Sequence, residues 1–205
     1  IGGGTNNSAA GGQSTIAGGG TNTTSGNYST VAGGSFNTAS SNYSTVAGGR
    51  FNTASSGYYS VIAGGINNTA SGFYSTVGGG RLNTASNSYS TVGGGMDNDA
   101  NGFSSSVLGG SGNNASGNMS SIIGGCGNTV SGNYSAIIAG QSFTLSASST
   151  GMVPNLIIND QLSFNNIITS SAATIGSGGG LPAINEGFMQ VSISGSTYKI
   201  PYFNV

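Results

Sequence analysis

Residues 28–42 read Tyr-Ser-Thr-Val-Ala-Gly-Gly-Ser-Phe-Asn-Thr-Ala-Ser-Ser-Asn, and the next fifteen residues repeat most of this pattern. The asparagine in this unit returns at the same place along most of the chain, with one residue inserted between Asn52 and Asn68. The column comprises Asn7, Asn22, Asn37, Asn52, Asn68, Asn83, Asn98, Asn113 and Asn128. A strict period of this kind is typical of one structural unit stacked many times.

Each unit contains two short extended segments separated by turns. Residues 28–32 are rich in β-forming types, and alternation places Val31 on one face and Tyr28 on the other. Gly33-Gly34 suits a turn because glycine adopts positive φ at little steric cost. A second extended segment covers residues 36–39, and another turn follows. We therefore predict an all-β fold: a parallel β-solenoid (β-roll) of about nine to ten 15-residue coils.

Two columns are expected to hold the coils together. Asparagine side chains form hydrogen-bonded ladders when identical residues stack, as they do in cross-β assemblies. The ladder residues that we single out are Asn37, Asn52, Asn68 and Asn83. A branched aliphatic column supplies the core, with Val31, Val46, Val77 and Val92 as its representatives.

A tyrosine column lies on the face opposite the aliphatic one, and its members are Tyr28, Tyr43, Tyr59, Tyr74 and Tyr89. One large aliphatic residue per coil gives a thin core that would be marginal alone. An uncovered aromatic stripe is typical of an interface. We expect a parallel homotrimer, because closed cyclic symmetry lets every chain bury the same stripe.

The composition argues against several classes of function. The 205-residue chain has no histidine and few charges: Arg50, Arg81, Lys199, Asp97, Asp99, Asp160 and Glu186. Such a chain offers no electrostatic surface for nucleic acid. No apolar run is long enough for a membrane span. We expect no enzymatic activity, no cofactor and no membrane insertion.

One segment partly matches a calcium-binding loop. Asp97, Asp99 and Asn101 follow the first half of the D-x-D-x-N-G pattern. The bidentate glutamate expected at the twelfth position is replaced by Leu108. A decorated solenoid turn is therefore the favoured interpretation, with calcium as the weaker alternative and no other metal site.

The repeats resemble a known family. Gly72-Phe-Tyr-Ser-Thr-Val-Gly-Gly-Gly80 and Asn83-Thr-Ala-Ser86 are similar to head repeats of trimeric autotransporter adhesins, although the period here is slightly longer. The resemblance covers about residues 1–140 and implies a trimeric parallel β-roll. It is also the main reason for expecting a trimer rather than a dimer.

The C-terminal part of the sequence differs from the repeats. Residues 141–186 depart from the period and are expected to form a transition region in which the three chains intertwine. Residues 187–205 suggest two alternating strands around a Ser194-Gly195-Ser196 turn, which would make a small C-terminal β-hairpin tip. This segment resembles the terminal segment of phage and viral fibre proteins. Candidate receptor contacts are Tyr198, Tyr202 and Phe203, with trimer packing as their favoured alternative.

These patterns favour a non-enzymatic, extracellular trimeric fibre of a phage or virus tail or a similar appendage. Its expected partners are further copies of itself, other fibre or virion proteins, and a cell-surface glycan or receptor. The alternative is a bacterial surface adhesin head of the trimeric autotransporter type.

A remote third hypothesis is an ice-binding β-solenoid, because threonines also stack. That column contains Thr15, Thr30, Thr45, Thr76 and Thr91, but it lapses at Val61, Ser106, Ser121 and Ala136. The sequence places tyrosine beside it instead of a second threonine rank.

Overall fold

The computed structural model describes residues 1–152, 187–193 and 196–202. The chain divides into two units, Ile1–Leu156 and Ile157–Val205, which are described separately. The described residues contain strands, turns and bends but no helix, so none of them forms a helix able to cross a membrane.

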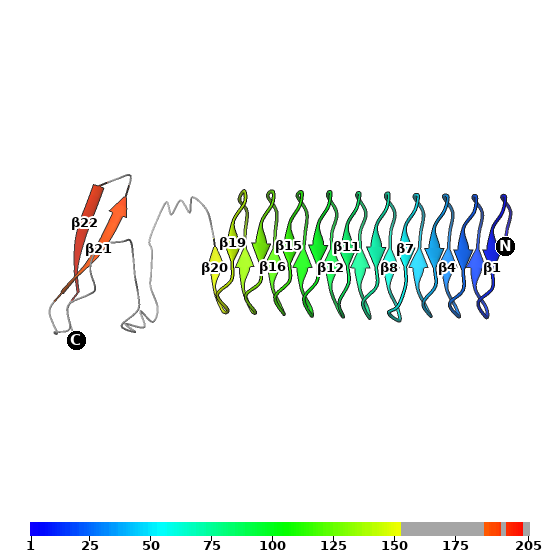
Figure 1. Ribbon diagram of the computed structural model, residues 1–205, viewed down its shortest axis with the longest axis horizontal. Helices are drawn as coiled ribbons and strands as arrows, with labels where there is room; N and C mark the ends of the chain where they lie inside the picture. The colour runs from blue at the N-terminus through cyan, green and yellow to red at the C-terminus, as the bar shows by residue number, and fades with distance from the viewer. Residues whose placement is uncertain (153–186, 194–195, 203–205) are drawn as a thin grey trace. The chain divides into compact units, whose positions relative to one another are not determined.

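The first unit is a parallel β-solenoid built from two ten-stranded sheets (Figure 1). One sheet holds the odd-numbered strands: β1 Ser8–Ala9, β3 Thr23–Thr24, β5 Thr38–Ala39, β7 Thr53–Ala54, β9 Thr69–Ala70, β11 Thr84–Ala85, β13 Asp99–Ala100, β15 Asn114–Ala115, β17 Thr129–Val130 and β19 Thr144–Leu145. The other holds the even-numbered strands: β2 Thr15–Ile16, β4 Thr30–Val31, β6 Thr45–Val46, β8 Val61–Ile62, β10 Thr76–Val77, β12 Thr91–Val92, β14 Ser106–Val107, β16 Ser121–Ile122, β18 Ala136–Ile137 and β20 Gly151–Met152. The predicted all-β solenoid of about ten coils is confirmed.

The register follows the sequence period. Thr30 pairs with Thr45, fifteen residues later, and this spacing holds for nearly all strand pairs. Only two pairs span sixteen residues, Thr45 with Val61 and Thr53 with Thr69. The extra residue therefore lies in the turn between β7 and β8, and both sheets resume their register beyond it.

The strands are shorter than predicted. Residues 28–32 contain only a two-residue strand, β4, because Tyr28 has φ 57° and already belongs to the turn. Likewise Phe36, at φ 56°, precedes the two-residue strand β5. Left-handed conformations cost about 1–2 kcal/mol for residues other than glycine. They persist here because the backbone is tied to the adjacent coil, as in the bond from the Tyr28 N–H to the Gly12 carbonyl at 2.8 Å.

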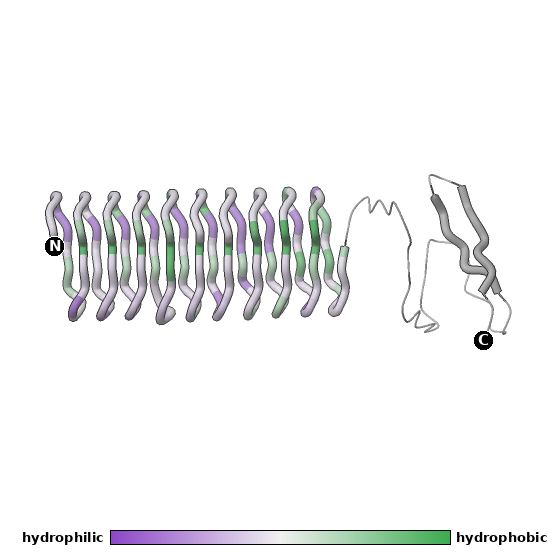
Figure 2. Tube along the Cα trace, turned by 180° about the vertical axis from the view of Figure 1, so that it is seen from behind, coloured by the Kyte–Doolittle hydropathy of each residue, from purple (hydrophilic) through white to green (hydrophobic). Residues whose placement is uncertain are grey.

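The core is thin and repetitive. Each inner coil buries one valine or isoleucine from an even strand and a small residue or valine from an odd strand, with asparagine and serine beside them. Val31, Ala39, Asn37 and Ser29 are all fully buried. Figure 2 shows the hydrophobic and hydrophilic positions recurring at corresponding places from coil to coil.

The solenoid extends past residue 140, where the sequence predicts the end of the repeats. β19 pairs with β17 and β20 pairs with β18, all in the regular parallel register. The remainder of the expected transition region, residues 153–186, lies outside the described residues.

In the second unit, β21 Gly187–Ile193 and β22 Ser196–Tyr202 pair in antiparallel fashion, from Gly187 with Tyr202 to Ile193 with Ser196. The expected turn residues Ser194 and Gly195 lie outside the described residues. A terminal β domain remains a prediction.

Candidate interaction surface

The ladder of buried asparagine side chains holds successive coils at a constant separation. Side chains on the outer surface therefore repeat at that same separation. The Asn83 side-chain oxygen accepts the backbone N–H of Asn98 at 3.0 Å. Its amide nitrogen donates to the carbonyl oxygens of Gly79 at 2.8 Å and Gly95 at 3.0 Å. The ladder is therefore mainly a side-chain-to-backbone one, whereas the sequence pattern predicts amides bonding to amides. Direct amide–amide bonds occur as well, such as Asn98 to Asn83 at 3.2 Å.

At one corner of the coil, tyrosine rings stack along the solenoid. We call Tyr28, Tyr43, Tyr59, Tyr74 and Tyr89 the tyrosine edge. Successive ring centroids lie 4.8–5.2 Å apart and the rings are within 11° of parallel. Stacking follows from the common left-handed backbone at these positions, which aims each ring in the same direction. The tyrosines remain exposed, Tyr43 at 42% and Tyr89 at 53%.

The other corner of the coil is also apolar but less uniform. We call its exposed members the mixed edge, comprising Phe36, Phe51, Ile66, Leu82 and Met96. Phe36 and Phe51 stack with centroids 4.9 Å apart. The Arg50 guanidinium lies 4.5 Å from the centroid of Phe51, in cation–π geometry.

The two flat faces between these corners differ in chemistry. The odd-numbered strands present a hydroxyl face of Thr-x-Ser triplets, in which threonine and serine point outward and the residue between them is buried. Its regular part comprises Thr23, Ser25, Thr38, Ser40, Thr53, Ser55, Thr69, Ser71, Thr84 and Ser86. Side chains in each rank repeat at the spacing between strands, about 4.8 Å.

The even-numbered strands present an aliphatic face. Beside the threonine rank, exposed alanines occupy the early coils, glycines the next two coils, and larger side chains the later ones. This second rank comprises Ala32, Ala47, Ala63, Gly78, Gly93, Leu108, Ile123 and Ile138. Leu108 is 58% exposed, which is high for an aliphatic side chain in a regular sheet.

Sequence reasoning missed the hydroxyl face. It followed only the threonines of the even strands, which lack a second hydroxyl rank beside them. The missed signal was the recurring Thr-Ala-Ser triplet, as in residues 38–40 and 53–55. Because Ala39 is buried, its two neighbours must both point outward.

The calcium candidates occupy this hydroxyl face and its corner. Asp99 replaces a threonine on β13, and partial burial raises its pKa; a hydrogen bond from Thr84 opposes the shift and the nearby Asp97 carboxylate adds to it. The Asn101 side-chain oxygen accepts the Ser86 hydroxyl at 2.7 Å, and its amide group lies 3.4 Å from the Asn114 oxygen. No group of three or more acidic, histidine or cysteine residues comes together within the described segments. This arrangement fits the decorated turn better than a cation site.

The remaining predicted contacts can be placed only in part. Tyr198 and Tyr202 belong to β22, whereas Phe203 lies outside the described residues. No protein-family model matches the chain, and a search of curated proteins found no similar sequence.

Proposed function

We propose that this protein is a non-enzymatic trimeric fibre segment that projects from an extracellular appendage, such as a virus tail, and attaches to a host surface. The observation that supports this proposal best is the tyrosine edge, a continuous exposed aromatic stripe five coils long. Monomeric proteins rarely leave a contiguous stripe of this kind in water.

The distribution of apolar side chains favours cyclic assembly. The interior of most coils buries only one valine or isoleucine together with a small residue, whereas large exposed side chains lie on the tyrosine edge and, in the later coils, on the aliphatic face. In a closed ring with more than two members, each chain contributes two different surfaces to its neighbours. The tyrosine edge and the aliphatic face are two such surfaces, and they adjoin because the tyrosine corner leads into the even-numbered strands.

Attachment in this scheme depends on multivalency. Three parallel chains present three copies of each exposed site, so weak individual contacts combine into a stable one. The side chains suited to contact are neutral, which favours glycans over nucleic acid or other strongly charged ligands.

The assembly can be tested by sedimentation of the chain at micromolar concentration. We expect three times the chain mass, and a shift toward monomer for the triple substitution Tyr43→Ser, Tyr59→Ser and Tyr74→Ser. The matched control, Thr53→Ser, Thr69→Ser and Thr84→Ser, changes three consecutive odd strands and should leave the trimer intact. A well-folded wild-type monomer would contradict the proposal.

The hydroxyl face favours a second candidate, binding to ice. The odd-numbered strands carry two adjacent ranks of small hydroxyl side chains on a flat sheet. The even-numbered strands carry only one such rank, their threonines. Thermal hysteresis of the purified protein tests this candidate. Activity that disappears in Thr53→Tyr but persists in Thr45→Tyr would assign it to the hydroxyl face, and the absence of hysteresis would eliminate it.

A further inference from the structure

The single inserted residue alters the surface of the solenoid but leaves its interior intact. Ala54 before the insertion and Ile62 after it are both fully buried. Across the longer coil, the Asn68 N–H still donates to the Asn52 side-chain oxygen at 3.0 Å, and the Asn68 amide does so at 3.1 Å. The structural consequence of the insertion is therefore confined to the turn between β7 and β8.

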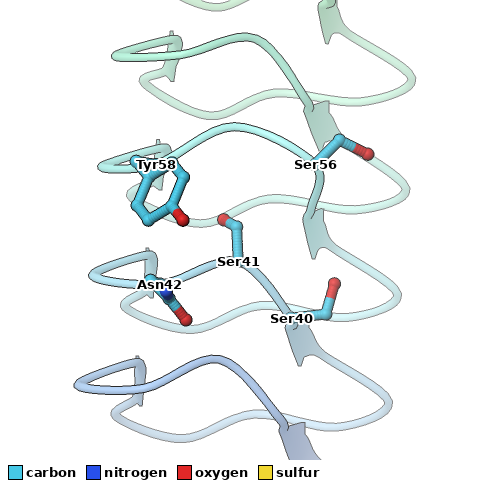
Figure 3. A pocket seen from close by; sticks show the side chains of 5 residues that line it. All are labelled: Ser40, Ser41, Asn42, Ser56 and Tyr58. Atoms are coloured by element: carbon cyan, nitrogen blue, oxygen red, sulfur yellow. The ribbon is translucent and has the colours of Figure 1, made fainter.

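This turn forms one wall of a surface hollow of about 220 Å³. The hollow is lined by Ser40, Ser41, Asn42, Ser56 and Tyr58. Figure 3 shows Ser41, Asn42 and Tyr58 on one side of it and Ser40 and Ser56 on the other. Ser40, which belongs to the hydroxyl face, is one of these lining residues.

Tyr58 gives the hollow an aromatic wall. One side of its ring stacks against Phe73, with centroids 5.6 Å apart, and the side chain remains 45% exposed. In the preceding coil the corresponding position is Asn42 instead of an aromatic residue. The ring therefore begins its stack, whereas Tyr43 and Tyr59 in the adjacent column have stacked neighbours on both sides.

The polar groups around the hollow are neutral, and some of them already form hydrogen bonds within the protein. The Asn42 side-chain oxygen accepts the Asn27 N–H at 2.9 Å, which fixes the amide orientation and directs its nitrogen away from that bond. The Ser41 hydroxyl lies 3.0 Å from the Ser60 hydroxyl, and both residues are buried. Ser40 and Ser56 contribute exposed hydroxyls, and the five described residues that line the hollow carry no charge.

We propose that this hollow binds one pyranose unit of a neutral glycan. A volume of 220 Å³ holds about seven water molecules, which is roughly the space of a single hexose. The Tyr58 ring would take the apolar C–H face of the sugar, and the Asn42 amide with the Ser40 and Ser56 hydroxyls would bond to its hydroxyl groups. The neutral lining disfavours sialic acid and phosphorylated sugars. This inference rests on the proposed role in attachment, and it names the hollow beside Tyr58 as the site that contacts the glycan.

The test measures binding of neutral methyl pyranosides (glucose, galactose, mannose and N-acetylglucosamine) to the full chain by saturation-transfer NMR and calorimetric titration. We expect weak binding of at least one, reduced about tenfold in Tyr58→Ala through loss of one aromatic contact. Deletion of Ser56, which restores a 15-residue coil, should abolish binding. The control Phe103→Ala removes an exposed aromatic from the same column, away from the hollow, and should bind normally.

Two results would overturn the assignment: no binding of any neutral pyranoside, or equal affinity in Tyr58→Ala. If the Ser56 deletion fails to fold, Tyr58→Ala and Phe103→Ala still decide the question. Sedimentation of the same samples separates the two proposals. A trimer that binds no sugar rejects the hollow alone, whereas a sugar-binding monomer rejects the assembly alone.

Discussion

The hydroxyl and aliphatic faces belong to the same coils and enclose the same interior, yet they differ in the side chains that they present. Both carry a threonine-rich rank, but the rank beside it is mainly serine on one face and alanine, glycine, leucine or isoleucine on the other. The inward positions between these ranks are alike in burial: Ala85 and Val92 are both fully buried. The interior thus determines where side chains stand, while the outer positions vary without altering it.

The position immediately before Phe36 and Phe51 points outward, and its residue type varies widely from coil to coil. It is occupied in successive coils by Ser35, Arg50, Ile66, Arg81, Met96, Ser111 and Cys126. These residues nevertheless continue the same parallel backbone pairing. By contrast, the interior asparagine position is unchanged over nine coils, because each side chain satisfies backbone groups of its neighbours.

The largest effect should come from an interior change, which disturbs both faces at once. Asn83→Ala leaves the buried Asn98 N–H and the Gly79 carbonyl without the partners described above, at about 1–3 kcal/mol for each group. We expect the free energy of unfolding to fall by about 3 kcal/mol in urea titrations followed by circular dichroism. The control, Asn87→Ala, removes an exposed asparagine of the same coil. Equal losses in the two variants would contradict the role of the ladder.

Glycine substitutions should separate inner from outer turn positions. Gly95 has φ +93°, and a Cβ there would overlap the Gly110 carbonyl oxygen. At Gly94, which lacks the left-handed φ, no atom lies within 4 Å of the place that a methyl group would occupy. We expect Gly95→Ala to lower the free energy of unfolding by about 2 kcal/mol, and Gly94→Ala to be neutral or slightly stabilising. Thermal and urea unfolding measure the stability of both variants. Similar losses of stability in the two would contradict the expected difference between the inner and outer turn positions.

The aliphatic face can be converted to resemble its counterpart. Leu108→Ser, Ile123→Ser and Ile138→Ser together place hydroxyls on three exposed positions. We expect weaker self-association, with about 1 kcal/mol lost per side chain that the assembly buries, and little change in folding of the chain. Sedimentation over a concentration series measures the change. Ser116→Ala, Ser131→Ala and Ser146→Ala on the opposite face should not alter association; if they do so equally, the faces are not functionally distinct.

The smallest effect should come from Asp99, an acidic residue that takes the place of a threonine on the hydroxyl face. Its pKa is raised by burial, so the folded chain holds this proton more tightly than the unfolded chain. The contribution of Asp99 to stability is therefore most favourable below its unfolded pKa and is lost as pH rises through the folded pKa. We expect Asp99→Asn to raise the melting temperature slightly at neutral pH and to have no such benefit in strong acid. A variant that melts lower at neutral pH would contradict this.

The sequence predicts the solenoid well, because the residues that recur with a strict period are those that occupy the same buried position in every coil. It predicts the ends of the strands poorly, because nothing in Tyr28 or Phe36 announces a left-handed backbone that tyrosine and phenylalanine ordinarily avoid. The predicted end of the solenoid comes too early because Phe143 stands where asparagine is expected. Its N–H nevertheless bonds to the Asn128 side chain at 3.0 Å.

The candidate surface was predictable only where one residue type repeats. The tyrosine edge is visible as a column of identical letters, whereas the hydroxyl face requires knowing that Ala39 points inward. The hollow beside Tyr58 depends on how one extra residue is accommodated in a turn, which no periodicity describes. Irregular features of this kind arise from local backbone geometry and become apparent only in three dimensions.

The uniform register has a consequence for how such a molecule changes over generations. Because every coil offers its neighbour the same backbone partners, an in-frame duplication or deletion of one coil's codons would lengthen or shorten the rod by about 4.8 Å and leave each remaining junction chemically unchanged. Reach would thus be adjustable in whole steps by recombination between neighbouring copies in the gene, independently of whatever the surface binds.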